Sequence, residues 1–163
     1  MLVLADESQA RKRIFEDHAG TWKATCDEHD GGKVYCRMFH IEKLTESHGK
    51  NFLQFGPAWT PDAVGFVVAT FMGFQQGTTV RIGVDKFPRR DFTAPKDNSL
   101  MTAPDVAKEI LAEMVKGHKQ VVMFQTRTGA RHLALVELGP FNELLVKVKQ
   151  QMAKNKQSSA PLK

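Results

Sequence analysis

Two cysteines, Cys26 and Cys36, are the residues of this 163-residue chain whose type and spacing best suit a defined chemistry, the formation of a disulfide bond. Between them, Asp30-Gly31-Gly32 is a strong turn signal that separates two stretches with strand character. Because Gly31 is the midpoint of the two cysteine positions, a tight hairpin would set the cysteines opposite each other, with Cβ atoms about 4.5–5.5 Å apart. The spacing therefore predicts a disulfide and an oxidising compartment. The alternative is a pair of buried thiols in a cytosolic protein.

The run Asp27-Glu28-His29-Asp30 contains the residue types of a metal site or an acid–base pair. Side chains alternate along a strand, so Asp27 and His29 would point one way and the other two residues the opposite way. A hairpin tip is also exposed to solvent, whereas catalytic groups need burial or a fixed partner. We therefore interpret this run as a solvated turn without catalytic function.

Other signatures of catalysis or metal binding are missing from the sequence. It has no Gly-x-Ser-x-Gly motif, no phosphate-binding glycine loop and no helical pair of histidines. Nine residues separate the two cysteines, which differs from the short cysteine spacing of zinc sites. We therefore expect no catalytic residues, no metal and no cofactor, in a protein that is not an enzyme.

The positive charge of the chain is concentrated near its C-terminal end. The formal net charge is +5, and five lysines follow the last acidic residue, Glu143, so that residues 1–143 sum to zero. These lysines are Lys147, Lys149, Lys154, Lys156 and Lys163. Residues 154–163 combine three of them with small and polar residues, which predicts a flexible basic tail. Such a tail favours weak, salt-sensitive contact with an anionic membrane, where each lysine contributes about 1 kcal/mol.

A second basic site is Arg89-Arg90, which lies close in sequence to Phe87 and Phe92. Arginines interleaved with aromatic residues can clamp a nucleic acid strand. Acidic residues flank the pair and offset its charge, so we interpret it as part of a surface loop and expect no nucleic-acid partner. The candidate interaction residues are therefore Arg89, Arg90, Lys147, Lys149, Lys154 and Lys156.

The first residues differ in character from the rest of the chain. Met1–Ala5 is apolar and is followed by a polar stretch, so residues 1–14 are predicted to be an N-terminal extension, either the remnant of a signal peptide or an ordinary start. Residues 6–20 have mixed charge, and we expect one or two helical turns there. The longest nearly apolar run, Val64–Phe74, has eleven residues, whereas a membrane-spanning helix needs about 20.

Residues 15–153 are predicted to form one domain, mainly of β structure. From Thr21 to Thr126, short alternating segments are separated by breakers such as Gly56-Pro57, a pattern typical of a sandwich or barrel. Two stretches have helical periodicity instead. The expected fold is mainly β: an antiparallel β-sandwich with one helix inserted late in the chain and a second, C-terminal helix.

The inserted helix has a recognisable start. Thr102 and Asp105 have the spacing of a capping box. The apolar face of this helix is expected to consist of Val106, Ile110, Leu111, Met114 and Val115. A hairpin of strands 120–126 and 132–138 is predicted to follow, and the final helix is predicted to begin near Phe141.

The order of these features resembles the invasion-associated locus B family of alphaproteobacteria. The opening Gly20-Thr21-Trp22, followed by Cys26 and by Cys36-Arg37-Met38, resembles the family's first strand and its cysteine pair across a hairpin. Further on, Phe71–Asp85 resembles the glycine-punctuated central strands of the family, and Leu138–Phe141 follows in the family's order. The resemblance is a pattern over roughly residues 15–150 rather than one specific motif.

This resemblance implies an exported, non-enzymatic β-sandwich protein of the bacterial periplasm or cell envelope, in a family linked in some pathogens to host-cell entry. We therefore expect a binding or structural protein with a protein partner, acting in host interaction or as an accessory subunit of an envelope complex. Many family members carry a second cysteine pair before the helix, whereas residues 91–103 contain none. The alternative, from a different class, is a cytosolic adaptor that binds nucleic acid or an anionic membrane through its basic tail.

Overall fold

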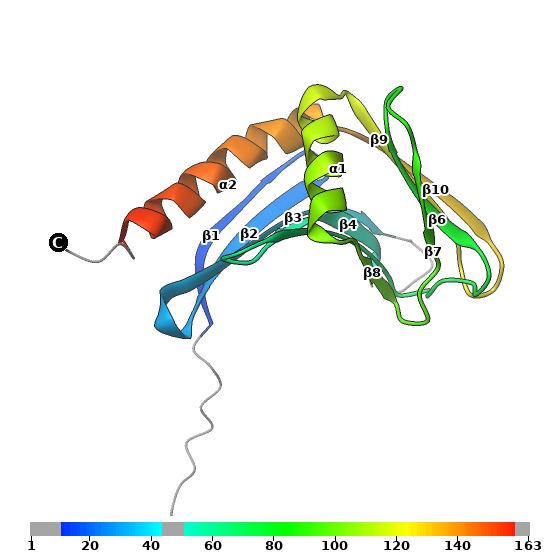
Figure 1. The fold of residues 1–163 in the computed structure, drawn as a ribbon, viewed down its shortest axis with the longest axis horizontal. Coiled ribbons are helices and arrows are strands. Elements are labelled where there is room, and N and C mark those ends of the chain that lie inside the picture. The colour runs from blue at the N-terminus through cyan, green and yellow to red at the C-terminus, as the bar shows by residue number, and fades with distance from the viewer. Residues whose placement is uncertain (1–10, 44–50, 159–163) are drawn as a thin grey trace, which may run out of the picture.

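In the computed structural model, which describes residues 11–43 and 51–158, the chain forms two antiparallel sheets and two α-helices (Figure 1). The strands are β1 (Lys12–Ala19), β2 (Trp22–His29), β3 (Lys33–Lys43), β4 (Asn51–Trp59), β5 (Val64–Thr70), β6 (Thr79–Val84), β7 (Arg90–Thr93), β8 (Ser99–Met101), β9 (Lys119–Gln125) and β10 (Arg131–Glu137). The helices are the 3-10 turn η1 (Asp30–Gly32), α1 (Pro104–Lys116) and α2 (Gly139–Ser158). One sheet has six strands in the order β1-β2-β3-β4-β5-β8, and the other has four in the order β10-β9-β6-β7.

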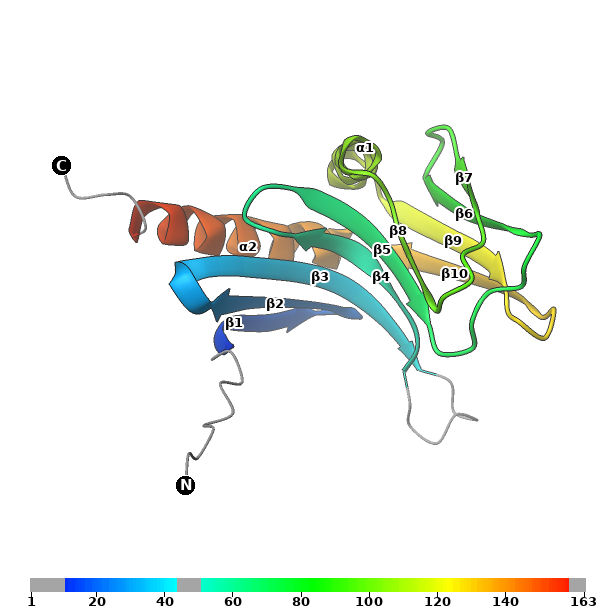
Figure 2. The ribbon, with the colours of Figure 1, turned by 60° about the horizontal axis from the view of Figure 1, so that its bottom comes forward.

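Both α-helices lie on one face of the six-stranded sheet, which we call the helix face (Figure 1). Helix α2 packs on β1, β2 and β3, whereas α1 packs on β5 and reaches β6 in the second sheet. The four-stranded sheet lies on the side of α1 that faces away from most of α2 (Figure 2). The predicted fold, a mainly β antiparallel sandwich with one inserted helix and one C-terminal helix, is therefore confirmed.

One hydrophobic cluster joins both sheets and both helices. Strand alternation produces it, since the side chains that face the helices or the second sheet are buried while their neighbours are partly exposed. The largest fully buried side chains include Trp22, Phe55, Phe66, Phe74 and Phe141. Trp22 also ties the sheets together, because its indole N–H donates a hydrogen bond to the backbone carbonyl of Glu137 at 3.0 Å.

Strand β1 replaces the helical turns that we expected before Gly20. It begins at Lys12, within the range that was predicted to be an N-terminal extension. The edge of β2 supplies backbone hydrogen-bond partners to this segment, and Ile14 and Phe15 pack against the core. Pairing with a neighbouring strand therefore outweighs the weak helical preference of a charged sequence.

Strand β4 runs through Gly56-Pro57, which we had interpreted as a break. The ladder to β3 is interrupted at this point, but pairing with β5 continues without a gap. Gly56 permits the close approach of the two backbones, because a Cβ there would lie 2.0 Å from the carbonyl oxygen of Met38. The two residues therefore mark a local irregularity within one strand rather than its end.

Thr102 does not cap α1, contrary to the predicted capping box. Ala103 precedes the helix without a side-chain hydrogen bond, and Pro104 occupies the first turn, where its missing N–H costs nothing. The hydroxyl of Thr102 instead accepts a hydrogen bond from the backbone N–H of Phe66 at 3.2 Å. The side chain is therefore used to join the end of β8 to β5.

The buried face of α1 differs from the predicted one at its C-terminal end. Ala107, Ile110 and Met114 form the buried stripe, with Glu113 beside them, whereas Val115 is exposed. One residue along a helix turns the side chain by about 100°. Because Met114 points into the core, Val115 must point away from it.

Helix α2 is longer than predicted and includes Lys154 and Lys156. The backbone of residues 154–158, which we expected within the flexible tail, is therefore helical. Within this last part of the helix, the side-chain amide of Gln151 donates a hydrogen bond to that of Asn155 at 2.9 Å. The rest of the predicted tail, with Lys163, lies outside the described residues.

Candidate functional site

A row of four side chains crosses the helix face from β2 to β5. Cys26 is opposite Cys36, Cys36 is opposite Trp59, and Trp59 is opposite Val64 in the strand register. Directly opposed residues of antiparallel strands project to the same face of a sheet. The indole of Trp59 therefore lies on the same face as the disulfide, one strand further along.

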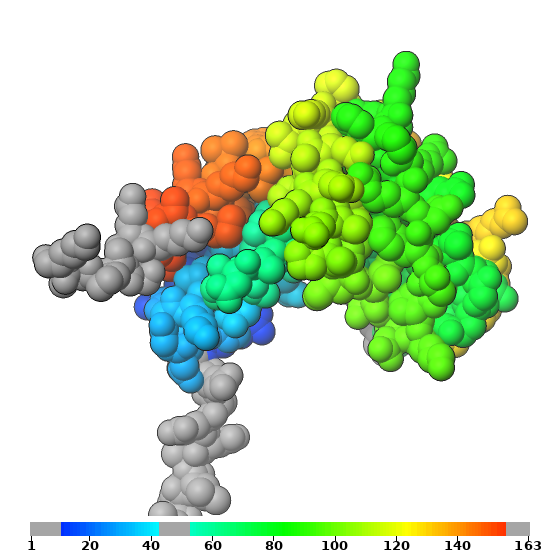
Figure 3. Space-filling model, in the orientation of Figure 1, coloured from blue at the N-terminus to red at the C-terminus, as the bar shows by residue number. Residues whose placement is uncertain are grey.

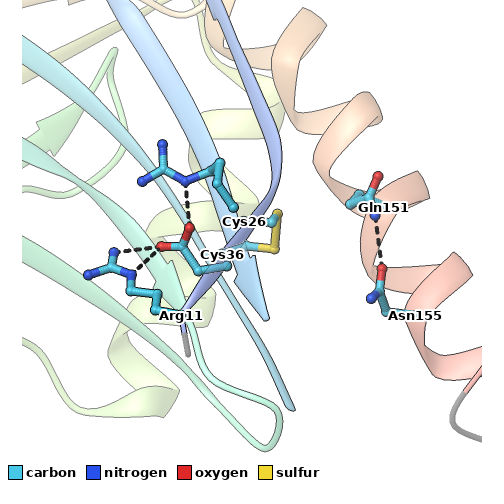
Figure 4. Close-up of a disulfide and its surroundings, with 7 residues drawn as sticks. Arg11, Cys26, Cys36, Gln151 and Asn155 are labelled. Atoms are coloured by element: carbon cyan, nitrogen blue, oxygen red, sulfur yellow. Dashed lines mark hydrogen bonds and ion pairs between the residues drawn. A yellow bond between two sulfur atoms is a disulfide. The ribbon is translucent and has the colours of Figure 1, made fainter. Parts of the chain in front are cut away.

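The cysteine pair forms the predicted disulfide across the β2–β3 hairpin. Both cysteines are buried, and Figure 4 shows their sulfurs directed toward α2. The turn η1, with Gly31 at a positive φ of 83°, closes the hairpin at the expected midpoint. The hairpin prediction is confirmed because both of its determinants, the turn residues and the symmetric spacing, are local in sequence.

A pocket of about 590 Å³ lies beside this disulfide, over the end of β4. It opens where α2, which covers β1 to β3, and α1, which covers β5, leave Trp59 between them. The lining residues that matter here are Trp59, Val64 and Met152, which are apolar, and Lys33, Lys108, Lys149 and Asp62. In Figure 3 the same elements, α2, the β4–β5 turn and α1, surround this part of the surface. We call this site the interhelix groove.

The interhelix groove combines an apolar floor with a positively charged rim. Lys33, Lys108 and Lys149 come from the hairpin, α1 and α2 respectively, and all three side chains are exposed. Asp62 is the acidic residue of the lining, so the formal charge around the opening is positive. The volume of the interhelix groove falls within the range of about 300–1,000 Å³ that small-molecule sites usually have. This arrangement suits a ligand with an apolar body and an anionic head.

The structure separates the lysines that the sequence analysis grouped together. Lys149 lines the interhelix groove. Lys147 faces β1, where its ammonium group donates to Asp17 at 2.8 Å, and this hydrogen bond raises the pKa of Lys147. Lys154 is exposed further along α2, and the side chain of Lys156 lies outside the described residues. Helix periodicity therefore directs the charges of this segment to different partners.

Arg89 and Arg90 also do not act as a pair. Arg89 is exposed in the turn between β6 and β7, whereas Arg90 is bound by two carboxylates of α1. The hydrogen bond from Arg90 to Glu113 raises the pKa of Arg90, and Glu109 accepts a second bond at 3.3 Å. Arg90 therefore fastens α1 to the four-stranded sheet.

The sequence predicted that Asp27 belongs to a solvated turn, and the structure shows that it does not. Its carboxylate is buried on the face opposite to the helices and accepts hydrogen bonds from Arg11 and Arg13. Burial alone would raise the pKa of Asp27, but the two guanidinium groups outweigh it and lower the pKa. The prediction failed because Arg13 lies in β1 and Arg11 directly precedes it, and the sequence did not reveal this strand.

The described residues contain no group of three or more His, Cys, Asp or Glu side chains arranged to hold a metal ion. Within the same part of the chain, neither α1 nor α2 is long and apolar enough to cross a membrane. The interhelix groove was missed in the sequence because Trp59, Lys108 and Lys149 are far apart along the chain. The sequence indicated only one wall of the groove, the β2–β3 hairpin, through the equal spacing of the two cysteines about Gly31.

The fold can be compared with those of known proteins. No sequence-family profile matches the chain, and the curated proteins include no match to it in sequence. Among solved structures, the crystal structure of invasion associated protein B from Bartonella henselae is similar, with a TM-score of 0.62 and 15% sequence identity. The similarity covers 86% of this chain and 98% of the other. The resemblance stated from the sequence is thus confirmed at the level of the fold.

Proposed function

We propose that this protein, which shares its fold with invasion associated protein B, is an exported binding protein of the bacterial envelope whose ligand site is the interhelix groove. The observation that carries this proposal is the apolar floor at Trp59 beneath a rim of three lysines. The disulfide supports export, because such bonds persist in oxidising compartments. The role requires binding only, and we propose that the protein is not an enzyme.

The occupant that fits the groove is a single-chain anionic amphiphile, such as a fatty carboxylate. Its chain would cover Trp59, Val64 and Met152, and removal of this apolar surface from water would supply the main stabilisation. Its head group would lie near Lys108 and Lys149, which approach the opening from two different helices. Charge–charge attraction there would select anionic over neutral amphiphiles.

The test uses the intrinsic fluorescence of Trp59 with dodecanoate below its micellar concentration. Trp22, the second tryptophan, is fully buried and serves as a constant background. We expect a saturable blue shift on binding, since the half-buried indole of Trp59 would become covered. Dodecanol, which has the same chain without the charge, should bind at least about tenfold more weakly. Equal affinity for the two probes, or no saturable binding, would contradict the proposed ligand class.

A pair of variants on the same helix provides the matched control. Lys149→Gln should weaken dodecanoate binding, because this lysine lines the groove. Lys154→Gln removes the same charge from an exposed position of α2 outside the lining and should leave binding unchanged. If both variants bind equally well or equally poorly, the groove is not the site and only the net charge matters.

Export is tested separately, by fractionating cells that produce the full-length gene product. We expect the protein in the periplasmic or envelope fraction with no reactive thiol. Two reactive thiols in a cytosolic fraction would favour the alternative, an adaptor that acts through its lysines on an anionic membrane. In that case the protein should also bind anionic vesicles in a salt-sensitive manner.

A further inference from the structure

Strand β10 forms one edge of the four-stranded sheet. The even-numbered residues of this strand, such as Ala134 and Val136, are buried, while Leu133 and Leu135 are 58% and 61% exposed. On β9, their register partners Met123 and Val121 are partly exposed on the same outer face. The outer face of the sheet thus carries an apolar stripe next to its open edge.

The backbone of β10 is also available for pairing at Leu133 and Leu135, whereas the carbonyl of Glu137, at the end of the strand, already accepts the hydrogen bond from Trp22. The backbone N–H of Leu138 donates to the carbonyl of His118, and that of Thr126 donates to the carbonyl of Ala130. These two bonds show that the even-numbered residues of β10 direct their backbone N–H and C=O groups toward β9. By the alternation of an antiparallel ladder, Leu133 and Leu135 direct their N–H and C=O groups away from β9. No described strand lies on that side of β10. An exposed edge with apolar side chains and no proline or lysine is a template for another strand.

The sequence of β10 is complementary to itself. It reads Arg131-His132-Leu133-Ala134-Leu135-Val136-Glu137, with Ala134 at its centre. If two copies pair antiparallel about Ala134, Leu133 of one lies opposite Leu135 of the other. In the same register Arg131 lies opposite Glu137, which gives an attractive ion pair at each end of the strand pair. Both charged residues are exposed.

We propose that the protein forms a symmetric dimer by antiparallel pairing of β10 with β10 of a second copy. The two four-stranded sheets would join into one sheet of eight strands, and the leucines of both copies would cover one another on its outer face. Such an interface is isologous, so the same residues act on both sides of the twofold axis. Two features favour this register of β10 against β10. The backbone groups of Leu133 and Leu135 point outward, and the charges at the strand ends are opposite in sign. This proposal is independent of the ligand in the interhelix groove.

The experiment measures the dimer dissociation constant of the purified chain by analytical ultracentrifugation. Arg131→Glu and Glu137→Arg should each weaken the dimer about tenfold or more, because each places like charges opposite one another at both ends. The double variant, Arg131→Glu with Glu137→Arg, should restore dimerisation, since it exchanges the two charges. Val146→Glu, which adds a charge at an exposed apolar position of α2, is the control and should dimerise normally.

Cysteine crosslinking tests the register directly. Leu133→Cys and Leu135→Cys proteins, oxidised together, should form a mixed disulfide, whereas each protein alone should crosslink far less. A chain that is monomeric at all concentrations would overturn the proposal, as would a double charge variant that dimerises no better than the single ones. If β10 instead pairs with a strand of another protein, the purified chain should be monomeric at all concentrations.

Discussion

Trp59 lies directly opposite Cys36 in the register of β3 and β4, so the indole at the floor of the interhelix groove is one strand away from the disulfide. The covalent bond closes the hairpin that forms one wall of the groove. The stability of the hairpin and the shape of the interhelix groove are therefore physically linked.

Reduction of the Cys26–Cys36 disulfide should lower the free energy of unfolding by about 2.5–3 kcal/mol, because the unfolded chain regains the entropy of a short open loop. Urea unfolding with and without reductant measures this change. Intact mass should increase by two hydrogens on reduction. An unchanged mass, with both thiols alkylated at once in the native protein, would show that the bond is absent from the protein in solution.

Asp27→Asn should destabilise the protein at neutral pH by about 1–3 kcal/mol, because Arg11 and Arg13 lose their charged partner. The pKa of Asp27 is lower in the folded than in the unfolded state. Its contribution to stability is therefore complete above the unfolded pKa of about 3.9 and is lost as the pH falls through the folded value. Urea melts should show a difference between wild type and variant at pH 7 that shrinks toward pH 2. A constant difference would contradict this assignment.

Ile110→Asp should destabilise the fold by several kcal/mol, since Ile110 is fully buried beneath α1 and the substitution buries a charge. Glu109→Ala on the exposed side of the same helix should be nearly silent, although it removes a weak contact with Arg90. Equilibrium unfolding in urea compares the two variants. Similar losses in both would mean that the buried face of α1 is assigned incorrectly.

Gln120→Leu should stabilise the protein by about 1–2 kcal/mol. Gln120 is fully buried in β9, and neither atom of its amide has a hydrogen-bond partner among the described residues. Replacement by an apolar side chain of similar size removes the cost of keeping this amide away from water. Thermal and urea unfolding measure the gain. A loss of stability would indicate instead that an internal water molecule satisfies the amide.

The sequence by itself determined the features whose causes are local. The turn at Asp30–Gly32 and the equal spacing of the cysteines fixed the register of β2 and β3, because a hairpin register follows from its turn. Alternation of apolar residues marked β6, an apolar run between breakers marked β5, and the turn at Thr128-Gly129-Ala130 marked β9 and β10. The 3.6-residue period marked α1 and most of α2. The fold class could therefore be predicted without a structure.

Only the tertiary structure decided how these elements meet. Lys108 and Lys149 border one groove because α1 and α2 cover different strands of the same sheet, leaving Trp59 open between them. Likewise, pairing of the N-terminal segment with β2 brought Arg11 and Arg13 to Asp27, so that an apparently solvated acid is a buried carboxylate bound by two exposed arginines. Neither arrangement has a local signal, since each depends on contacts between residues far apart along the chain. The periodicity of apolar residues specifies the strands and helices, whereas the packing of their faces determines which residues meet at the interhelix groove and at Asp27.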